Sequence, residues 1–485
     1  MKAGETPTVA IIGAGMSGIC MAVKLQGAGI DTFTIFEKAD EVGGTWRDNT
    51  YPGLTCDVPS RFYAYTFRPN PAWSRFMPSG AEIQSYFRTV AEEWGLRQHI
   101  RFGTEVTAAR YDDGRWRVTT AAGEEAFDVL VTATGVLRVP RYPDVEGLET
   151  FSGATFHSAR WDHSISLHDK RIGLIGTGST GVQITSALGG NVRRLEIFQR
   201  TPQWVCPTPN FRYRRHTKAA LRRWAVLNGF AYKFWQGYFE KVFGRAVVEP
   251  CWQRRLVARL CRWNLRLSVR DPELRRRLTP DYQAMCKRQV VAGHYYQAIQ
   301  RPGVEVVTDA IDHVEARGVV TADGTLHELD VLVLATGFDA RAYVRPMDVV
   351  GEGGLTLAQA WAGGARAYRS VAVPGFPNMF MLMGPHSPIG NQSLVPIAED
   401  QADYAVWWIK RIADGRVSSA APTEVATKVY NEEMKSAMPQ TVWLTGCSSW
   451  YLGEDGLPEL FPWRPGRHRA LLRAPDTRDF DVRTT

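Results

Sequence analysis

The sequence predicts an α/β fold in which two Rossmann-like dinucleotide-binding domains carry a helical insertion. Two glycine-rich turns predict the domains, because each turn follows a short apolar segment typical of a buried parallel strand and leads into a helix. A strongly basic stretch, with aromatic and aliphatic residues at helical spacing, predicts the insertion.

The first glycine-rich turn follows the apolar residues 9–12 and reads Gly13-x-Gly15-x-x-Gly18. In such a turn Gly13 permits a tight bend, Gly15 lets a pyrophosphate approach the backbone, and Gly18 lets helix and strand pack closely. The N-terminus of the next helix offers free N–H groups to phosphate oxygens, and we expect Ser17 to contact the pyrophosphate.

A second predicted strand, residues 32–36, is followed directly by Glu37. A carboxylate about 20 residues after the glycine turn accepts hydrogen bonds from a ribose 2′-hydroxyl. We therefore expect the first turn to bind a dinucleotide whose adenosine ribose is not phosphorylated.

The same pattern recurs after residues 171–175 as Gly176-x-Gly178-x-x-Gly181. Its next strand, residues 195–198, is followed by Arg200 instead of an acid. A guanidinium binds a 2′-phosphate with paired hydrogen bonds, whereas a carboxylate would repel it. The second turn therefore suits NADPH.

Two further apolar segments, residues 128–132 and 330–334, are each followed by Ala-Thr-Gly. These matched segments suggest that the chain leaves one nucleotide domain and later returns to it. We expect an FAD domain at 1–145 and 345–485, an NADPH domain at 146–208 and 281–344, and the helical insertion at 209–280. Two dinucleotides in one chain imply electron transfer, for which a hydride donor and a flavin are the economical pair.

Composition excludes several classes of protein. The 485-residue chain has no apolar run long enough for a membrane-spanning helix, and its start does not resemble a secretory signal. The seven cysteines are scattered without metal-ligand spacing, so we expect thiols that are mostly in the core or incidental, no metal site, and a reducing, cytoplasmic location.

The net charge of +8 is unevenly distributed. Residues 212–277 hold 18 Lys and Arg against 4 Asp and Glu, so the rest of the chain is acidic. A basic stretch can serve nucleic acid or an anionic membrane surface. Packing against the nucleotide domains is the simpler interpretation of its aromatic spacing.

Two long motifs carry a family resemblance. The segment 44–57, which contains Tyr51-Pro52-Gly53 and ends at Asp57, is similar to one typical of Baeyer–Villiger monooxygenases. The segment 151–162 resembles their fingerprint and lies between the two glycine-rich turns, as in that family; its matching positions are Phe151, Gly153, His157, Trp161 and Asp162. The resemblance covers nearly the whole chain.

The resemblance implies a reaction. NADPH reduces FAD, the flavin reacts with O2 at its C4a atom, and the peroxyflavin attacks a ketone and inserts one oxygen next to the carbonyl. The product is an ester or lactone. By the same resemblance Arg288 is the catalytic cation beside the flavin, because a fixed positive charge stabilises the anionic oxygens, and Asp57 holds that arginine.

The resemblance also assigns the other site residues. The cofactor-binding set adds Thr45, Trp46, Tyr63, Val106, Thr177, Ser179, Thr180, Gln183, Thr201, Lys287 and Trp450, with Lys287 and Thr201 beside Arg200 at the 2′-phosphate. His386, Ile389 and Asn391 are expected to form a substrate wall. We expect His157 to be a hinge or supporting residue and not a general base. Trp161 and Asp162 are expected to fix the linker between the domains.

Two alternatives remain beside this interpretation. A flavin-containing monooxygenase that oxygenates nitrogen or sulfur shares the layout and the cofactors. A non-catalytic protein whose basic stretch binds nucleic acid or an anionic membrane would show steep salt dependence. We expect a ketone and O2 as reaction partners, no nucleic acid and no transmembrane segment; the sequence leaves monomer and homo-oligomer open.

Overall fold

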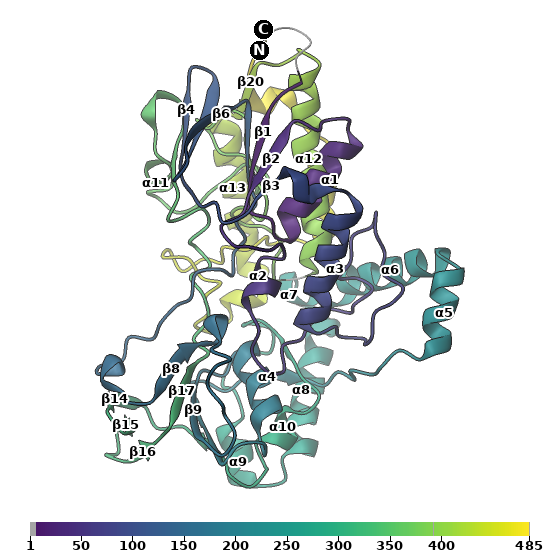
Figure 1. The fold of residues 1–485 in the computed structure, drawn as a ribbon. Coiled ribbons are helices and arrows are strands. Elements are labelled where there is room, and N and C mark those ends of the chain that lie inside the picture. The colour runs from purple at the N-terminus through teal and green to yellow at the C-terminus, as the bar shows by residue number, and fades with distance from the viewer. Residues whose placement is uncertain (1–5, 391, 485) are drawn as a thin grey trace.

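The structure, a computed structural model, describes residues 6–390 and 392–484. The chain forms two lobes, each built on a parallel sheet with helices against it, and connecting segments run between them (Figure 1).

The sheet of the upper lobe has the strand order β19-β7-β1-β2-β3, and every neighbouring pair is parallel. All four residues of the central strand β1 are apolar and buried, as expected where both faces of a parallel sheet are covered. Helix α1 follows β1 directly and packs against α12. The bounds are β1 (Val9–Ile12), α1 (Met16–Gly27), β2 (Phe33–Phe36), β3 (Ile100–Arg101), β7 (Val129–Thr132), β19 (Met379–Met381) and α12 (Leu394–Ala413).

The sheet of the lower lobe has the order β13-β10-β9-β17-β8 and is also parallel throughout. Helix α4 follows β9, as α1 follows β1. The bounds are β8 (Ala154–His157), β9 (Arg171–Ile175), α4 (Ser179–Leu188), β10 (Arg194–Phe198), α10 (Tyr295–Ala298), β13 (Val304–Val307) and β17 (Val331–Leu334). The two sheets confirm the predicted α/β fold.

Smaller sheets and helices complete each lobe. The upper lobe carries β4 (Val106–Asp112), β5 (Arg115–Thr120), β6 (Gly123–Phe127) and β18 (Asp348–Val350), with α2 (Thr45–Asp48), α3 (Gly80–Glu93), α11 (Leu357–Ala360), α13 (Glu424–Ala437) and α14 (Pro465–Arg473). The lower lobe carries β14 (Ile311–Glu315), β15 (Gly318–Thr321) and β16 (Leu326–Glu328). Strand β4 begins at Val106, and just before it the Thr104 N–H donates a hydrogen bond to the Glu37 carbonyl.

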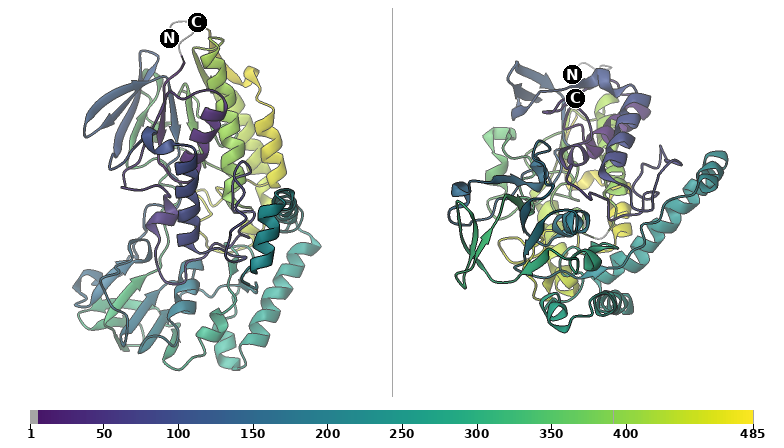
Figure 2. Two further views of the ribbon diagram at one scale, coloured as in Figure 1. Left: turned by 45° about the vertical axis from the view of Figure 1, so that its right-hand side comes forward. Right: turned by 60° about the horizontal axis from the view of Figure 1, so that its bottom comes forward.

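The basic stretch is helical between the short paired strands β11 (Val205–Cys206) and β12 (Val290–Val291). It contains α5 (Arg215–Arg223), α6 (Val226–Tyr238), α7 (Gly244–Val248), α8 (Trp252–Ser268) and α9 (Pro272–Arg277). Its inner aromatic rings pack on the upper lobe, where Tyr232 and Phe239 lie 5.3 and 5.4 Å from Phe62. The outer part, α5 and α6, projects from the right side of the body in Figure 1 and comes toward the viewer in the left view of Figure 2.

The cysteines depart from the sequence prediction at one place. Cys286 and Cys447 form a disulfide across 161 residues of sequence, so the expectation of thiols was wrong for this pair. Spacing could not show it, because the fold alone brings these distant segments together. The pairing weakens the cysteine argument for a reducing compartment, and a cytoplasmic location stays a prediction. Among the described helices, none combines the length and apolar content needed to cross a bilayer.

Candidate active site

A single cavity of about 1290 Å³ reaches both glycine-rich turns. Its wall includes the residues that follow the carboxyl ends of β1, β2, β7, β9, β10 and β17. Ligands of open parallel sheets bind at such strand ends. The volume exceeds the roughly 300–1,000 Å³ of a site for one small ligand, so the cavity has room for more than one.

The first turn has the geometry that its glycines predict. Gly13 has a φ of +106°, which favours glycine. A Cβ atom on Gly18 would lie 1.9 Å from the Gly13 carbonyl oxygen, so the close contact of helix and strand requires a glycine there. A Cβ on Gly15 would meet only ordinary contacts, the nearest at 3.6 Å, because this glycine faces the cavity.

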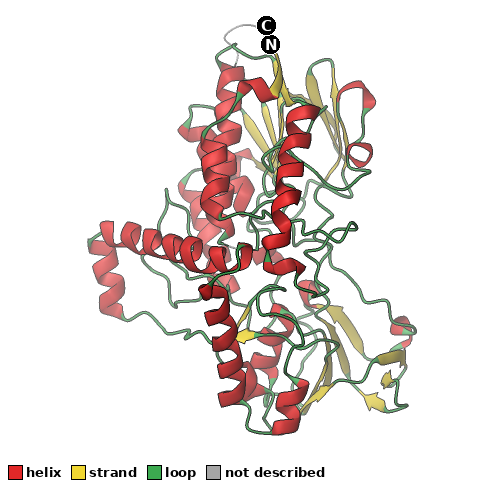
Figure 3. Cartoon of the chain, turned by 180° about the vertical axis from the view of Figure 1, so that it is seen from behind, coloured by secondary structure: helices red, strands yellow, loops and turns green. Residues whose placement is uncertain are grey.

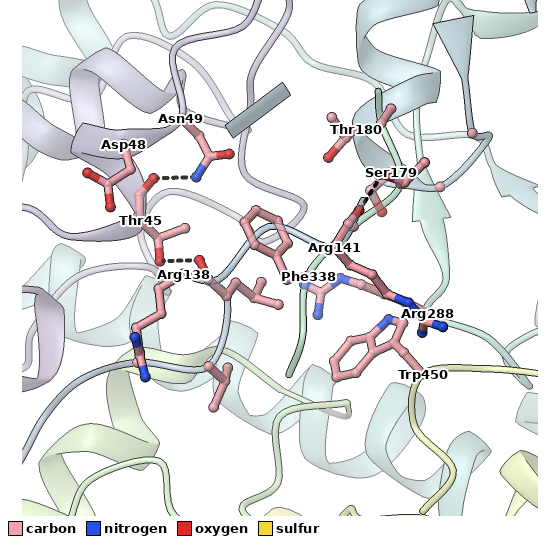
Figure 4. A pocket seen from close by; sticks show the side chains of 18 of the residues that line it. Thr45, Asp48, Asn49, Arg138, Arg141, Ser179, Thr180, Arg288, Phe338 and Trp450 are labelled. Atoms are coloured by element: carbon pink, nitrogen blue, oxygen red, sulfur yellow. Dashed lines mark hydrogen bonds between the residues drawn. The ribbon is translucent and has the colours of Figure 1, made fainter. Parts of the chain in front are cut away.

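The second turn repeats this geometry. Gly176 has a φ of +112°, and a Cβ on Gly181 would lie 2.1 Å from the Gly176 carbonyl oxygen. A Cβ on Gly178 would meet nothing within 4 Å. Beside the turn, Ser179 and Thr180 begin α4 and line the cavity (Figure 4).

The strand ends differ in charge. Glu37 is buried, and its carboxylate accepts hydrogen bonds from the Ala14 and Ala39 N–H groups at 2.8 and 3.0 Å. Arg47 lies 3.0 Å from the same carboxylate. Glu37 therefore fixes the loop of the first turn as well as lining the cavity.

At the second strand end the charge is positive. Arg200 is exposed and lines the cavity together with Thr201 and Lys287. Thr177 donates a hydrogen bond of 2.7 Å to the Thr201 carbonyl, which ties this segment to the second turn. Burial, with a further contribution from the Arg200 charge, lowers the pKa of Lys287. Two cations that line one cavity wall can attract an anion.

Arg288 and Asp57 form an ion pair in the cavity wall. The arginine donates two hydrogen bonds, Nε to Oδ2 at 2.9 Å and Nη2 to Oδ1 at 3.0 Å. This bidentate geometry joins residues 231 positions apart in the chain. The Asp57 charge raises the pKa of Arg288, so its positive charge is permanent.

The remaining predicted cofactor residues surround the same space. The Trp46 Nε1–H donates to the Tyr63 hydroxyl at 2.8 Å, and Gln183 accepts from Tyr51 at 3.0 Å. Thr45 lies opposite Arg288 and Trp450 in the close view (Figure 4). Ser17, Thr45, Trp46, Tyr63, Val106, Gln183 and Trp450 all line the cavity.

The described residues of the predicted substrate wall lie at and beside the cavity. Ile389 lines the cavity, whereas His386 lies in a small adjoining hollow, where burial lowers its pKa to about 4. The third residue of this set, Asn391, lies outside the described residues.

The fingerprint residues stand away from the cavity wall. Phe151, Gly153, His157, Trp161 and Asp162 are absent from its lining. The buried His157 ring lies 5.6 Å from Tyr142 and 5.9 Å from Phe338, and both of these residues do line the cavity. Trp161 packs edge-on against Phe156, and Asp162 accepts hydrogen bonds from Ser164.

Two connecting segments, one that follows β7 and one that follows β17, contribute cavity residues that the sequence did not predict. Arg138, Arg141, Tyr142 and Phe338 line the cavity. The segments hydrogen-bond to each other, from the Arg141 N–H to the Gly337 carbonyl and from the Asp339 N–H to the Val139 carbonyl, both at 2.9 Å. The two Ala-Thr-Gly repeats marked their positions, since each segment starts there.

The disulfide adjoins this site. Cys286 precedes Lys287 and Arg288 by one and two residues, and Cys447 precedes the cavity-lining Ser448, Ser449 and Trp450. The bond therefore joins the segment of the ion pair to the segment that carries Trp450.

These residues fit two dinucleotides. Both turns present glycines whose missing side chains leave room at the cavity, Glu37 suits a ribose, and the Arg200–Lys287 pair suits an additional phosphate.

Known proteins resemble this chain along its whole length. The Flavin-binding monooxygenase-like family matches residues 6–347. An uncharacterized monooxygenase of Mycobacterium tuberculosis is 53% identical over 99% of this chain and 97% of its own length. A Baeyer–Villiger monooxygenase of Streptomyces coelicolor is 38% identical over 99% of this chain and 93% of its length.

Solved structures agree with the sequence comparisons. A cyclohexanone monooxygenase from Rhodococcus sp. Phi1, bound to NADP+, superposes with a TM-score of 0.88 at 32% identity, over 99% of this chain and all of its own. OTEMO in complex with FAD and NADP gives a TM-score of 0.89 at 28% identity over the same shares.

Proposed function

The chain belongs to the flavin-binding monooxygenase-like family, and from this premise we propose how its residues divide the work of the reaction. It is an FAD- and NADPH-dependent monooxygenase of the Baeyer–Villiger class. Bound FAD, reduced by NADPH, supplies the activated oxygen. The protein has to bind both cofactors, keep water from the reacting oxygen and stabilise negative charge on it.

The first turn and its neighbours are proposed to hold FAD. Gly13, Gly15, Ser17 and Gly18 take the pyrophosphate and Glu37 the ribose, while Thr45, Trp46, Tyr63 and Val106 enclose the rest of the cofactor. The second turn, Gly176 to Gly181, with Gln183 and Thr201 is proposed to hold NADPH. Arg200 and Lys287 would bind its 2′-phosphate, and Trp450 would cover its other end.

Arg288 is the proposed catalytic residue, and its ion pair with Asp57 is the observation that carries the proposal. The guanidinium lies in the wall of a cavity that both turns share. A positive charge already in position stabilises an oxygen anion without reorganisation. Asp57 holds the arginine in place through two hydrogen bonds.

The connecting segments are the proposed hinge between an FAD domain of residues 1–145 and 345–485 and an NADPH domain of residues 146–208 and 281–344. The fingerprint would act on this hinge, because His157 packs against Tyr142 and Phe338, one residue from each segment. Residues 209–280 form the proposed insertion.

We propose an apolar ketone as the organic substrate and O2 as the second substrate. Ile389, Met383 and Leu394 give one part of the cavity an apolar lining. His386 lines the adjoining hollow, to which Ile389 and Trp450 also contribute, and it stays in the proposed substrate wall. We propose that the enzyme is cytoplasmic.

Replacing Arg288 tests the catalytic assignment. Arg288→Ala is expected to keep bound FAD and to lower ketone oxygenation at least about 100-fold, as loss of one oxyanion donor does. Arg288→Lys keeps the charge but loses the bidentate geometry, so we expect intermediate activity. Flavin absorbance and ester formation measure the two effects. Ester formation by Arg288→Ala at near wild-type rate would overturn the assignment.

A further inference from the structure

Helix α8 presents an exposed apolar row to solvent. Its inner side, with Val257, Cys261 and Leu265, is buried in the protein. Five apolar side chains on the outer side are between 38% and 59% exposed; they are Trp252, Leu256, Leu260, Trp263 and Leu267. At 3.6 residues per turn these positions fall within an arc of about 80°. Such a contiguous row marks an interaction site more often than scattered exposed residues do.

A row of arginines runs beside the apolar row. Arg255, Arg259, Arg262 and Arg266 are all exposed and fall on the neighbouring arc of the helix. We call these nine residues together the α8 face. No Asp or Glu occurs in Trp252–Ser268.

The arginines of the α8 face carry uncompensated charge. Within the described part of the chain, no ion pair reaches any of the four, whereas Arg276 and Arg277 nearby both pair with Glu273. Glu249, just before the helix, is already paired with Arg245 and Arg464. The charge of the face is therefore free to attract an anion.

We propose that the α8 face binds the surface of an anionic lipid bilayer. Tryptophan and leucine side chains enter the boundary between headgroups and acyl chains, and arginines beside them meet the anionic headgroups. The helix lies in the plane of the surface, so its length does not have to match the bilayer thickness. Seen from behind, α8 runs along the near side of the lower lobe (Figure 3).

Two other occupants fit the charges less well. A second copy of the chain, meeting this face about a two-fold axis, would bring two rows of arginines together without acids between them. A nucleic acid would satisfy the arginines through its phosphates, but it would leave Leu256, Leu260 and Leu267 without apolar partners. An anionic bilayer matches both rows at once.

The same insertion carries a second exposed apolar row. On α6, Val226, Phe230 and Phe234 are 76%, 71% and 57% exposed. Lys233 lies beside them and is exposed as well. The surface proposed for lipid binding therefore belongs to an insertion in which exposed apolar and basic residues recur together.

Vesicle co-sedimentation of the holoenzyme tests the proposal. We expect binding to vesicles that contain phosphatidylglycerol, weak binding to pure phosphatidylcholine, and weakening by salt. Trp252→Ser/Trp263→Ser should lower the partition coefficient at least about tenfold, because two apolar side chains no longer leave water. Arg259→Gln/Arg262→Gln should lower it for anionic vesicles only.

Matched controls use equally exposed residues elsewhere. Val425→Ser/Val429→Ser on α13 removes apolar side chains that are 73% and 60% exposed, and Arg193→Gln removes an exposed arginine. These variants should bind vesicles like the wild type. All variants should retain FAD and NADPH oxidation, which shows that they are folded.

Each other outcome would overturn the proposal. Equal binding to neutral and anionic vesicles would show that the arginines do not contribute to binding. No binding above the control level would show that the α8 face does not bind lipid. A dimer in ultracentrifugation that Trp252→Ser/Trp263→Ser dissociates would assign the face to a second copy. Salt-dependent binding of a DNA or RNA oligonucleotide without vesicle binding would assign it to nucleic acid.

Discussion

The two glycine-rich turns are nearly the same in backbone geometry. Gly13 and Gly176 have φ values of +106° and +112°, and Gly18 and Gly181 each lie against the first glycine of their own turn. In both turns the middle glycine, Gly15 or Gly178, borders the shared cavity.

The turns differ at the end of the next strand. Glu37 is buried and bound to backbone N–H groups, whereas Arg200 is exposed beside the second cation Lys287. The glycines fix how a pyrophosphate can approach, and the charge at the strand end determines which ribose can follow it. On the proposed assignment of the two sites, cofactor choice is therefore separable from the fold of the turn.

Alanine at the two middle glycines should give the largest effect and separate the sites. Both residues have φ values that alanine adopts, −79° and −67°, so the free chain should fold. Gly15→Ala is expected to abolish FAD binding, because its methyl group would stand between backbone and pyrophosphate. Gly178→Ala should keep FAD and raise the KM for NADPH roughly 100-fold. Flavin absorbance and steady-state kinetics measure both.

The distinction between the two turns is wrong if Gly15→Ala affects NADPH instead of FAD, or if either variant affects both cofactors. Loss of FAD from Gly178→Ala at unchanged secondary structure would show that the turns do not serve separate cofactors. Gly27→Ala in α1, where a Cβ meets nothing within 4 Å, is the matched control and should behave like the wild type.

Removing the charge at the second strand end should give the next largest effect. Arg200→Ala is expected to raise the KM for NADPH about 10- to 100-fold, since a hydrogen bond to a charged group contributes about 1.5–3 kcal/mol. The KM for NADH should change little, because NADH has no 2′-phosphate. An equal rise for both coenzymes would remove the phosphate assignment.

Lys287 should give a smaller effect that depends on pH. A lysine attracts phosphate only while protonated, and burial beside Arg200 lowers the pKa of Lys287, so its proton is lost at a lower pH than usual. The KM for NADPH should therefore rise as the pH rises toward the alkaline range. Lys287→Met should raise this KM roughly tenfold at neutral pH and flatten its rise. A KM for NADH with the same pH profile would contradict the assignment.

The paired turns were predictable because their determinants are local. Glycines at fixed spacing, apolar strands and the residue after the second strand all lie within short segments, and the fold follows from their repetition. Arg288 and Asp57 were found only through the family resemblance, since 231 residues separate them.

Contacts that form only in the tertiary fold could not be predicted from local sequence patterns. The cavity residues Arg138, Arg141 and Phe338 come from two connecting segments that meet only in the folded chain. The Cys286–Cys447 bond has the same origin. The position of His386 has the same origin, because the folded chain places this residue in a hollow beside the cavity, together with Ile389 and Trp450.

One measurement tests the central claim most directly. Purified enzyme is given NADPH, oxygen-18 gas and a panel of apolar ketones, and the products are analysed by mass spectrometry. We predict an ester or lactone that carries one labelled oxygen and forms in step with NADPH consumption. NADPH consumption that yields only hydrogen peroxide with every ketone, while a sulfide or amine in the same assay is oxygenated, would contradict the claim.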